Sequence, residues 1–194
     1  CVSEVNNAIY YFVGRQLIEL KIDSLEERVV SEVGTPYSPG GRANPTADGK
    51  YVCSIVAEPF PDTGKKSISY SYSSFVQNFE RKPHSQIFKV NLENGDWDVI
   101  HEDHRSMGHI NTSPTQPEIM TFCHEGPWHW IDQRIWGLNI HTKEAWKIRK
   151  QQDDYSIGHE YWFADGERIG YHGRPRDNNG EHVFGHIKWN NEDH

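Results

Sequence analysis

One sequence pattern recurs along this chain: apolar and polar residues alternate, and a polar turn follows them. Its last three copies begin at Gln86, Arg134 and His182 and are therefore 48 residues apart, and an earlier copy begins at Gln16. Alternation with a period of two is typical of a half-buried β-strand. A fixed interval of this size predicts a repeat architecture in which each unit contributes the same strands.

A second sequence pattern precedes the first and predicts two short strands joined by a turn. Its copies begin at Thr46, Thr115 and Phe163, and their turns are Asp48-Gly49, Gln116-Pro117 and Asp165-Gly166. Such residues favour the tight turns of β-hairpins. The two patterns together predict a unit of four short strands, A to D, which is typical of a β-propeller blade.

We therefore expect an all-β fold with about four blades, although another repetitive antiparallel architecture, such as stacked sheets, is the alternative. The chain opens with strands B, C and D over residues 8–33, contains two whole blades and stops near the end of strand C in a fourth. The first interval is longer because residues 62–84 are inserted between strands B and C. No stretch shows sustained helical periodicity.

The chain begins at Cys1, without a methionine and inside a strand pattern. We expect residues 1–194 to form one partial propeller domain, with a broken blade at each end. Four blades could also close a small ring if the two end blades completed each other.

The charge balance limits the partners of the protein. The sequence has 20 Lys and Arg against 28 Asp and Glu, a net charge of −8, so the overall field repels nucleic acid. An anionic ligand must therefore meet a local cluster of cations. No apolar run is long enough to span a membrane, and no signal peptide is visible. Three cysteines without a CxxC motif indicate a reducing compartment, and we expect the cytoplasm.

The blade topology predicts which residues meet. In a blade, the D-to-A and B-to-C connections lie on one face of the disc, and the other turns lie on the opposite face. His109 and His159 fall at equivalent D-to-A junctions, 50 residues apart. The B-to-C connections carry His124, Glu125, Arg134, His172, Arg174 and Arg176, with Lys65, Lys66, Arg81 and Lys82 in the insertion. We expect this face to hold the functional site and the basic insertion to be a mobile loop over it.

Two runs on that face resemble a known family. They read GHINTSPTQPEIMTFCHEGPWHWIDQRIW from Gly108 and GHEYWFADGERIGY from Gly158. Both are similar to the oligogalacturonate lyases, which are seven-bladed propellers of bacteria that degrade pectin fragments. The CHEGP element with flanking histidines is the most specific part of the resemblance, and the similarity covers most of the chain.

The resemblance implies β-elimination across the C4–C5 bond of a galacturonate unit, in an acidic oligosaccharide substrate. It also implies a manganese ion that binds the substrate carboxylate, a histidine base and an arginine beside that base. By position, His159 matches a metal ligand and His109 is the candidate base, while Arg81 is the candidate arginine. Removing a proton next to a carboxylate builds enolate charge, which a metal or a cationic side chain must stabilise.

Four further residues are candidates for substrate binding. They are His124, Glu125, Arg134 and Arg174. His124 and Glu125 could instead be structural, and Arg134 could brace its loop through Asp132. Two tryptophans of the same loop, Trp128 and Trp130, could stack on sugar rings or cover a blade edge.

The sequence also departs from the family pattern. The remaining manganese ligands of the family, a Gln-x-x-His-x-His cluster, belong to a later blade that this chain does not include. We therefore expect the isolated chain to bind metal poorly, because a single histidine rarely holds manganese. Near the expected arginine the sequence offers Arg81, His84 and Gln86.

Two other function classes remain open. A propeller that serves only as an interaction platform would lack a histidine cluster and expose an apolar patch. A propeller glycoside hydrolase would need paired carboxylates across the mouth, for which Glu125 and Glu160 are the candidates. The sequence leaves the oligomeric state open.

Overall fold

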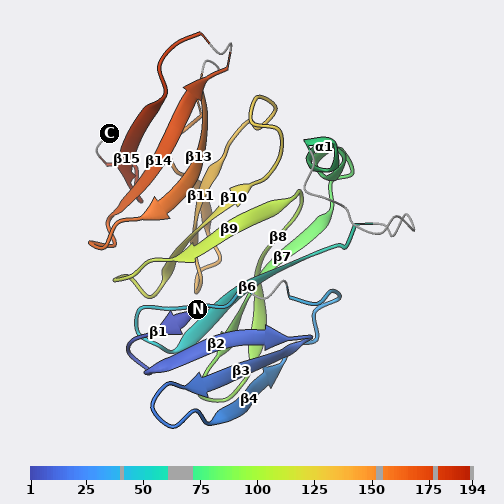
Figure 1. Cartoon of the computed structure of the whole chain (residues 1–194), viewed down its shortest axis with the longest axis vertical. Coiled ribbons are helices and arrows are strands. Elements are labelled where there is room, and N and C mark those ends of the chain that lie inside the picture. Colours follow the sequence, from blue (N-terminus) through green and yellow to red (C-terminus); the bar gives the residue numbers. More distant parts are fainter. Residues whose placement is uncertain (40–41, 61–71, 152–154, 177–178, 193–194) are drawn as a thin grey trace.

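The fold is a succession of antiparallel sheets along the chain (Figure 1). The computed structural model describes residues 1–39, 42–60, 72–151, 155–176 and 179–192. Within each sheet, strands that are consecutive in the sequence are neighbours in space. This arrangement confirms the predicted all-β fold built from four-stranded repeating units.

The sheets have the following strands. The first contains β1 (Val2–Ser3), β2 (Ala8–Val13), β3 (Gln16–Lys21) and β4 (Glu27–Glu32). The second contains β5 (Asn44–Pro45), β6 (Tyr51–Ala57), β7 (His84–Asn91) and β8 (Trp97–His104). The third contains β9 (Met107–Thr112), β10 (Ile119–His124), β11 (Ile135–Asn139) and β12 (Ala145–Lys147). The fourth contains β13 (Tyr155–Trp162), β14 (Arg168–Pro175) and β15 (Val183–Lys188).

The first sheet has one strand more than the sequence predicted. Val2 pairs with Ile9 and Ser3 pairs with Ala8, so that β1 supplies the strand A that the prediction lacked. Two residues are too few to show an alternating pattern. In the fourth sheet, the described strands are A, B and C, as expected.

The insertion contains a helix, which corrects the expectation that it is only a loop. Helix α1 spans Tyr72–Glu80, while the predicted basic residues Lys65 and Lys66 lie outside the described residues. The apolar residues Phe75, Val76 and Phe79 have helical spacing, but nine residues are fewer than the window in which periodicity is reliable. In the described part of the chain, no helix has both the length and the apolar character that crossing a bilayer requires.

The hydrophobic core lies between successive sheets. Tyr10 and Leu17 of the first sheet pack with Phe88 of the second in one fully buried cluster. A second cluster joins the second and third sheets, and a third joins the third and fourth, where Ile135 meets Ile169. Burying each such side chain contributes roughly 1.5–3 kcal/mol. Face-to-face packing therefore fixes each sheet against the next.

The first strands of the sheets lie side by side. β1 contacts β5, β5 contacts β9, and β9 contacts β13. Thr112 of β9 donates a hydrogen bond of 2.7 Å to the Pro45 carbonyl of β5, and Trp162 of β13 donates one of 3.1 Å to the Asn111 carbonyl of β9. These strands are therefore the innermost ones, and side chains at equivalent positions on them converge.

Candidate active site

His109 and His159 occupy the same irregular position in consecutive sheets. Both have a left-handed backbone, with φ of 45° and 54°. The pairing of β9 with β10 shifts register between Thr121 and Cys123, and that of β13 with β14 shifts between Gly158 and Tyr161. Such bulges turn a side chain out of its normal direction, and left-handed φ at a non-glycine residue costs of order 1–3 kcal/mol. Both histidines therefore have a strained backbone, and the bulges set the direction of their side chains.

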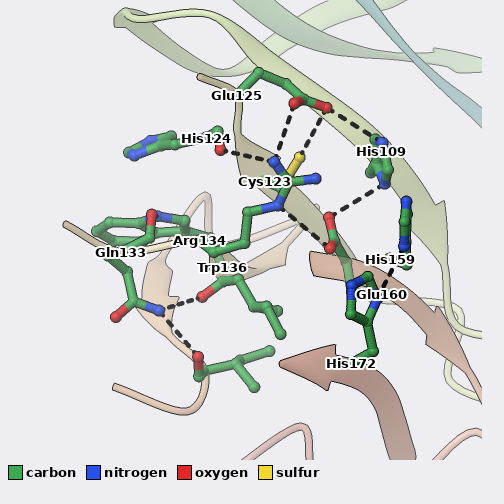
Figure 2. Close-up of polar contacts among 12 residues, drawn as sticks. His109, Cys123, His124, Glu125, Gln133, Arg134, Trp136, His159, Glu160 and His172 are labelled. Atoms are coloured by element: carbon green, nitrogen blue, oxygen red, sulfur yellow. Dashed lines mark hydrogen bonds and ion pairs between the residues drawn. The ribbon is translucent and has the colours of Figure 1, made fainter. Parts of the chain in front are cut away.

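Two carboxylates flank the His109 ring, one at each nitrogen. Nε2 lies 3.2 Å from Oε1 of Glu125, and Nδ1 lies 3.3 Å from Oε1 of Glu160. Glu125 follows β10 in the same sheet, whereas Glu160 comes from β13 of the next sheet. The Glu160 side chain is 0% exposed and that of Glu125 is 19% exposed, so the two partners differ in depth. Figure 2 shows the ring between them.

Arg134 connects the two carboxylates. Its Nη1 lies 3.0 Å from Oε2 of Glu125, and its Nε lies 3.4 Å from Oε2 of Glu160 (Figure 2). Its side chain is only 4% exposed. Burial disfavours the guanidinium charge, but the neighbouring carboxylates of Glu160 and Glu125 hold the pKa of Arg134 above its ordinary value. A charged arginine is therefore fixed in the interior between the third and fourth sheets.

The predicted bracing of the loop by Arg134 through Asp132 is wrong. Asp132 accepts a hydrogen bond of 3.0 Å from Nη1 of Arg105 instead. Arg134 braces the loop through Glu125 and through a bond of 3.3 Å to the His124 carbonyl. The sequence order Asp-x-Arg suggested a local pair, but the interior places Arg134 beside more deeply buried acids.

His159 faces a second histidine. Its Nδ1 lies 2.8 Å from Nδ1 of His172, and the two rings are 4.4 Å apart (Figure 2). The Trp128 ring contacts both, and the Arg174 guanidinium lies 4.8 Å from the centre of that ring. Burial and the nearby His159 lower the pKa of His172. His172 and Arg174 were predicted to lie in the B-to-C loop, but they belong to strand β14.

His124 lies apart from this cluster. Because side chains alternate along a strand, its ring points away from His109, as Figure 2 shows. Its side chain is 6% exposed, packs beside Trp136, and has Nε2 3.6 Å from Asp103. Burial, with the nearby Arg105 charge, lowers the pKa of His124 to about 4. Its predicted role in substrate binding stays a prediction, and its surroundings are those of a structural residue.

A cavity of about 720 Å³ opens beside His109 and Glu125. Two arginines, Arg42 and Arg81, also line it, together with α1 residues such as Phe75. This volume is in the range of ligand sites. Arg81 donates to the carbonyls of Glu58 and Pro59 and to Asn78 of α1, so the helix holds it at the cavity wall. The structure thus brings together the candidate base and the candidate arginine.

His109, Cys123 and Glu125 could in principle hold a metal, since their ligand atoms lie within 4.8 Å of one another. Burial raises the pKa of the Cys123 thiol well above its ordinary value, so the sulfur stays protonated. Arg134 already binds Glu125, and its positive charge opposes a second cation there. Manganese prefers oxygen and imidazole ligands. These three residues therefore do not fit manganese.

His159 fits an imidazole ligand better. His172 engages Nδ1, and no hydrogen bond from the described residues engages Nε2. An engaged second nitrogen is what orients metal-binding histidines. His159 is also an exposed residue.

Sequence reasoning underrated Glu160 and His172. Glu160 follows His159 just as Ile110 follows His109, and Ile110 is 2% exposed. The sequence signal for Glu160 was therefore its charge, because the equivalent position in the preceding sheet is apolar. His172 lies opposite Gly158 in the pairing of β13 with β14, and it meets His159 because the register shifts directly after Gly158, which the sequence pattern does not reveal.

Sheets of this topology, packed face to face with their first strands side by side, define a β-propeller. The β-propeller domain of the trilobed protease from Pyrococcus furiosus is similar, with a TM-score of 0.54, 13% identity, and coverage of 92% of this chain and 46% of that one.

The family follows from a closer match. A family model described as "Oligogalacturonate lyase" matches residues 1–183, and the chain belongs to this family. It is 23% identical to an oligogalacturonide lyase of Pectobacterium atrosepticum over 94% of this chain and 46% of the relative. It is 23% identical to an oligogalacturonate lyase of Dickeya dadantii over 88% of this chain and 43% of the relative. The chain therefore spans about half the length of these curated relatives.

Two solved structures of oligogalacturonate lyases are similar. One from Vibrio parahaemolyticus has a TM-score of 0.80 and 26% identity, with coverage of 92% of this chain and 46% of that one. An oligogalacturonate lyase in complex with manganese has a TM-score of 0.80 and 24% identity, with coverage of 94% of this chain and 47% of that one. The resemblance expected from the CHEGP element is thereby confirmed at the level of the family.

Proposed function

We propose that the protein is a lyase that cleaves oligogalacturonides by β-elimination, with His109 as the base. The observation that carries the proposal is His109, which lines a cavity together with two arginines and whose left-handed backbone is repeated at His159 of the adjacent innermost strand. Membership of the family supports the same reaction. A left-handed backbone at the same position of two consecutive sheets supports a functional role for these histidines, because such conformations cluster at active sites.

The proposed reaction uses no water. The base takes the C5 proton, whose bonding electrons form the C4–C5 double bond as the C4–O bond breaks, and the leaving oxygen then gains a proton. A histidine suits this step because a neutral imidazole is basic near neutral pH. Arg81, at the wall of the same cavity, supplies positive charge for the substrate carboxylate or for the enolate that develops.

Local cations would offset the repulsion between an anionic substrate and the net charge of −8. Arg42 and Arg81 line the cavity, and Arg174 lies over Trp128 next to His159. An acidic oligosaccharide that reaches from the cavity to Trp128 would meet cations at both ends. Trp128 is also an aromatic surface for a sugar ring, although its contacts to both histidines give it a structural role as well.

Manganese would be held by His159, with further ligands outside the described residues. The ion would neutralise a substrate carboxylate and so favour loss of the adjacent proton. One of the similar solved structures is a complex with manganese, and we extend the metal to this chain as part of the proposal.

The glycoside hydrolase alternative is less well supported. Such an enzyme needs one carboxylate on each side of the bond to be cleaved. Glu125 and Glu160 instead lie on the same guanidinium, and the Glu160 side chain is 0% exposed. A carboxylate that is closed to solvent and paired with a buried arginine does not suit a hydrolase.

The test incubates the full-length gene product with digalacturonate and manganese, and follows ultraviolet absorbance of unsaturated uronate alongside reducing ends. We expect both signals together, and neither for His109→Ala. The matched control is His141→Ala, since His141 is an exposed histidine in a turn on the opposite face. Reducing ends without absorbance would contradict the lyase proposal. Weaker manganese binding by His159→Ala than by His141→Ala, measured by calorimetry, tests the metal ligand separately.

A further inference from the structure

We propose that Glu160 is the positioning residue of His109: buried and held by Arg134, it accepts a hydrogen bond from the Nδ1–H group of His109 and thereby presents Nε2 to the cavity. The inference rests on the proposed function and deepens it, because it assigns the residue that selects which nitrogen of the base faces the substrate.

The two carboxylates at the ring have unequal freedom. Glu160 is 0% exposed, belongs to a strand, and has its other oxygen 3.4 Å from Nε of Arg134. Glu125 is 19% exposed, lies beyond the last residue of β10 and lines the cavity. A ligand in the cavity can therefore reach Glu125, whereas Glu160 is closed off from it. Nε2 is thus the nitrogen that a substrate can reach.

The charge on Glu160 has a fixed partner. An ionised carboxylate in the interior is stable only when it is paired, and Arg134 provides the pair. A carboxylate can only accept hydrogen bonds, so Nδ1 of His109 must carry a proton to bond with it. When the ring is neutral and has a single proton, Nε2 is then left with the lone pair that a base requires.

Glu125 has a different function in this arrangement. Its carboxylate meets Nε2 from the cavity side and also binds Nη1 of Arg134. Gly108, next to His109, leaves the space it needs, because a β-carbon at Gly108 would lie 2.9 Å from Oε1 of Glu125. Because a carboxylate can only accept hydrogen bonds, Glu125 bonds to Nε2 only while that nitrogen also carries a proton. Once an anionic substrate displaces Glu125, Glu160 still bonds to the protonated Nδ1, and Nε2 is the nitrogen that loses its proton.

Glu160→Gln separates the positioning role from a structural one. An amide has the size of the carboxylate, but its oxygen would turn to the Arg134 donors and its NH₂ group would face Nδ1. The neutral ring would then protonate on Nε2, which is the wrong nitrogen for the reaction. A base in the wrong tautomer lowers the rate on the order of 10²–10⁴-fold, as general-base contributions indicate.

The experiment measures kcat and KM on digalacturonate, and reads the His109 tautomer by nitrogen NMR of histidine-labelled protein without substrate. For Glu160→Gln we expect kcat to fall by a factor of about 100 or more, within the range given for general-base catalysis, with KM little changed and the neutral ring protonated on Nε2. Glu125→Gln should keep the Nδ1 proton and a higher kcat than Glu160→Gln. Glu160→Asp, which retains the charge, should restore the Nδ1 proton.

Glu19→Gln is the matched control, because Glu19 is a buried, arginine-paired glutamate of the first sheet. Rates are expressed per folded molecule, so that a loss of stability alone does not count. The proposal is overturned if Glu160→Gln keeps the Nδ1 proton, or if its kcat falls no further than that of Glu19→Gln. The NMR readout needs no turnover, so it stands even if the wild type produces no unsaturated product, which would instead contradict the proposed function.

Discussion

Two buried glutamates in this protein each pair with an arginine, yet their surroundings differ. Glu19 accepts hydrogen bonds of 2.7 Å from Tyr10 and 2.5 Å from Arg28. Among the described residues, its side-chain partners come from its own sheet, and Arg28 is 54% exposed. Glu160 has its partners in the neighbouring sheet, and its arginine, Arg134, is 4% exposed.

The difference separates a structural cluster from a functional one. The Glu19 cluster joins three strands of one sheet and contains no group that titrates near neutral pH. The Glu160 cluster joins two sheets and ends on His109, which has a strained backbone. Two carboxylates share a single guanidinium there, an excess of negative charge that a structural tie does not need. The first cluster holds a sheet together, and the second aims a ring.

Removing the arginine should show the largest contrast. Arg134→Met leaves two carboxylates without a cation, one of them fully buried, and we expect about 3–5 kcal/mol of lost stability. Arg28→Met removes a half-exposed partner, while Tyr10 and Lys21 still bond to Glu19, and should cost about 1 kcal/mol. Urea unfolding of both variants makes the measurement. Equal losses would mean that the two clusters are alike.

As the pH is lowered, the region around His124 should lose stability at a higher pH than the Glu19 cluster of the first sheet. The pKa of buried His124 is about 4, lower than its ordinary 6.5. Between these values the unfolded chain binds a proton that the folded protein does not. The free energy of unfolding therefore decreases as the pH is lowered from 6.5 to 4, by up to about 3 kcal/mol. His124→Phe should remove this slope in unfolding experiments between pH 6.5 and 4. A slope that persists in the variant would show that another group is responsible.

The Glu19 cluster should respond at lower pH. Burial opposes the charge of Glu19, but hydrogen bonds from Arg28, Tyr10 and Lys21 hold its pKa at about 2, below its ordinary 4.5. Its stabilising effect is therefore complete above about pH 4.5 and is lost as the pH falls toward 2. Glu19→Gln should cost about 1–3 kcal/mol at neutral pH and flatten this acid limb. A variant with the acid limb of the wild type would contradict the assignment.

Adding one methyl group should have the smallest effect. A β-carbon at Gly108 would lie 2.9 Å from Oε1 and 3.0 Å from Cγ of Glu125, so the Glu125 side chain would have to shift. Gly108→Ala should therefore lower stability by less than about 1 kcal/mol but change KM, because Glu125 moves at the cavity wall. Gly14→Ala, where no atom lies within 4 Å, is the comparison, although its φ of +60° adds strain. An unchanged KM for Gly108→Ala would show that Glu125 does not limit access.

Much of the architecture could be predicted from the sequence, because it depends on local alternation and turn residues. The 48-residue interval places the strands, and the topology places His109 and His159 on one face. Strand β1 and helix α1 were missed because each is too short to show a period. Short elements owe their structure to the partners they pack against rather than to their own pattern.

The site was less predictable, because its contacts cross from one sheet to the next. Arg134 was a candidate for substrate binding, with bracing through its neighbour Asp132 as the alternative, whereas its partners in the structure are Glu125 and Glu160. His124 precedes Glu125 but points to the other side, since a strand alternates its faces. Which acid meets which base is decided by the packing of β13 against β9, and single-sequence patterns do not contain this information.

Glu160 is proposed to act through proton removal by His109, and a kinetic isotope effect tests this claim most directly. Digalacturonate with deuterium at C5 is compared with the ordinary substrate for the wild type, Glu160→Gln and Glu19→Gln. If the wrong tautomer slows proton removal, Glu160→Gln shows a full primary isotope effect on kcat, larger than that of Glu19→Gln. An isotope effect for Glu160→Gln no larger than that of Glu19→Gln would contradict the claim.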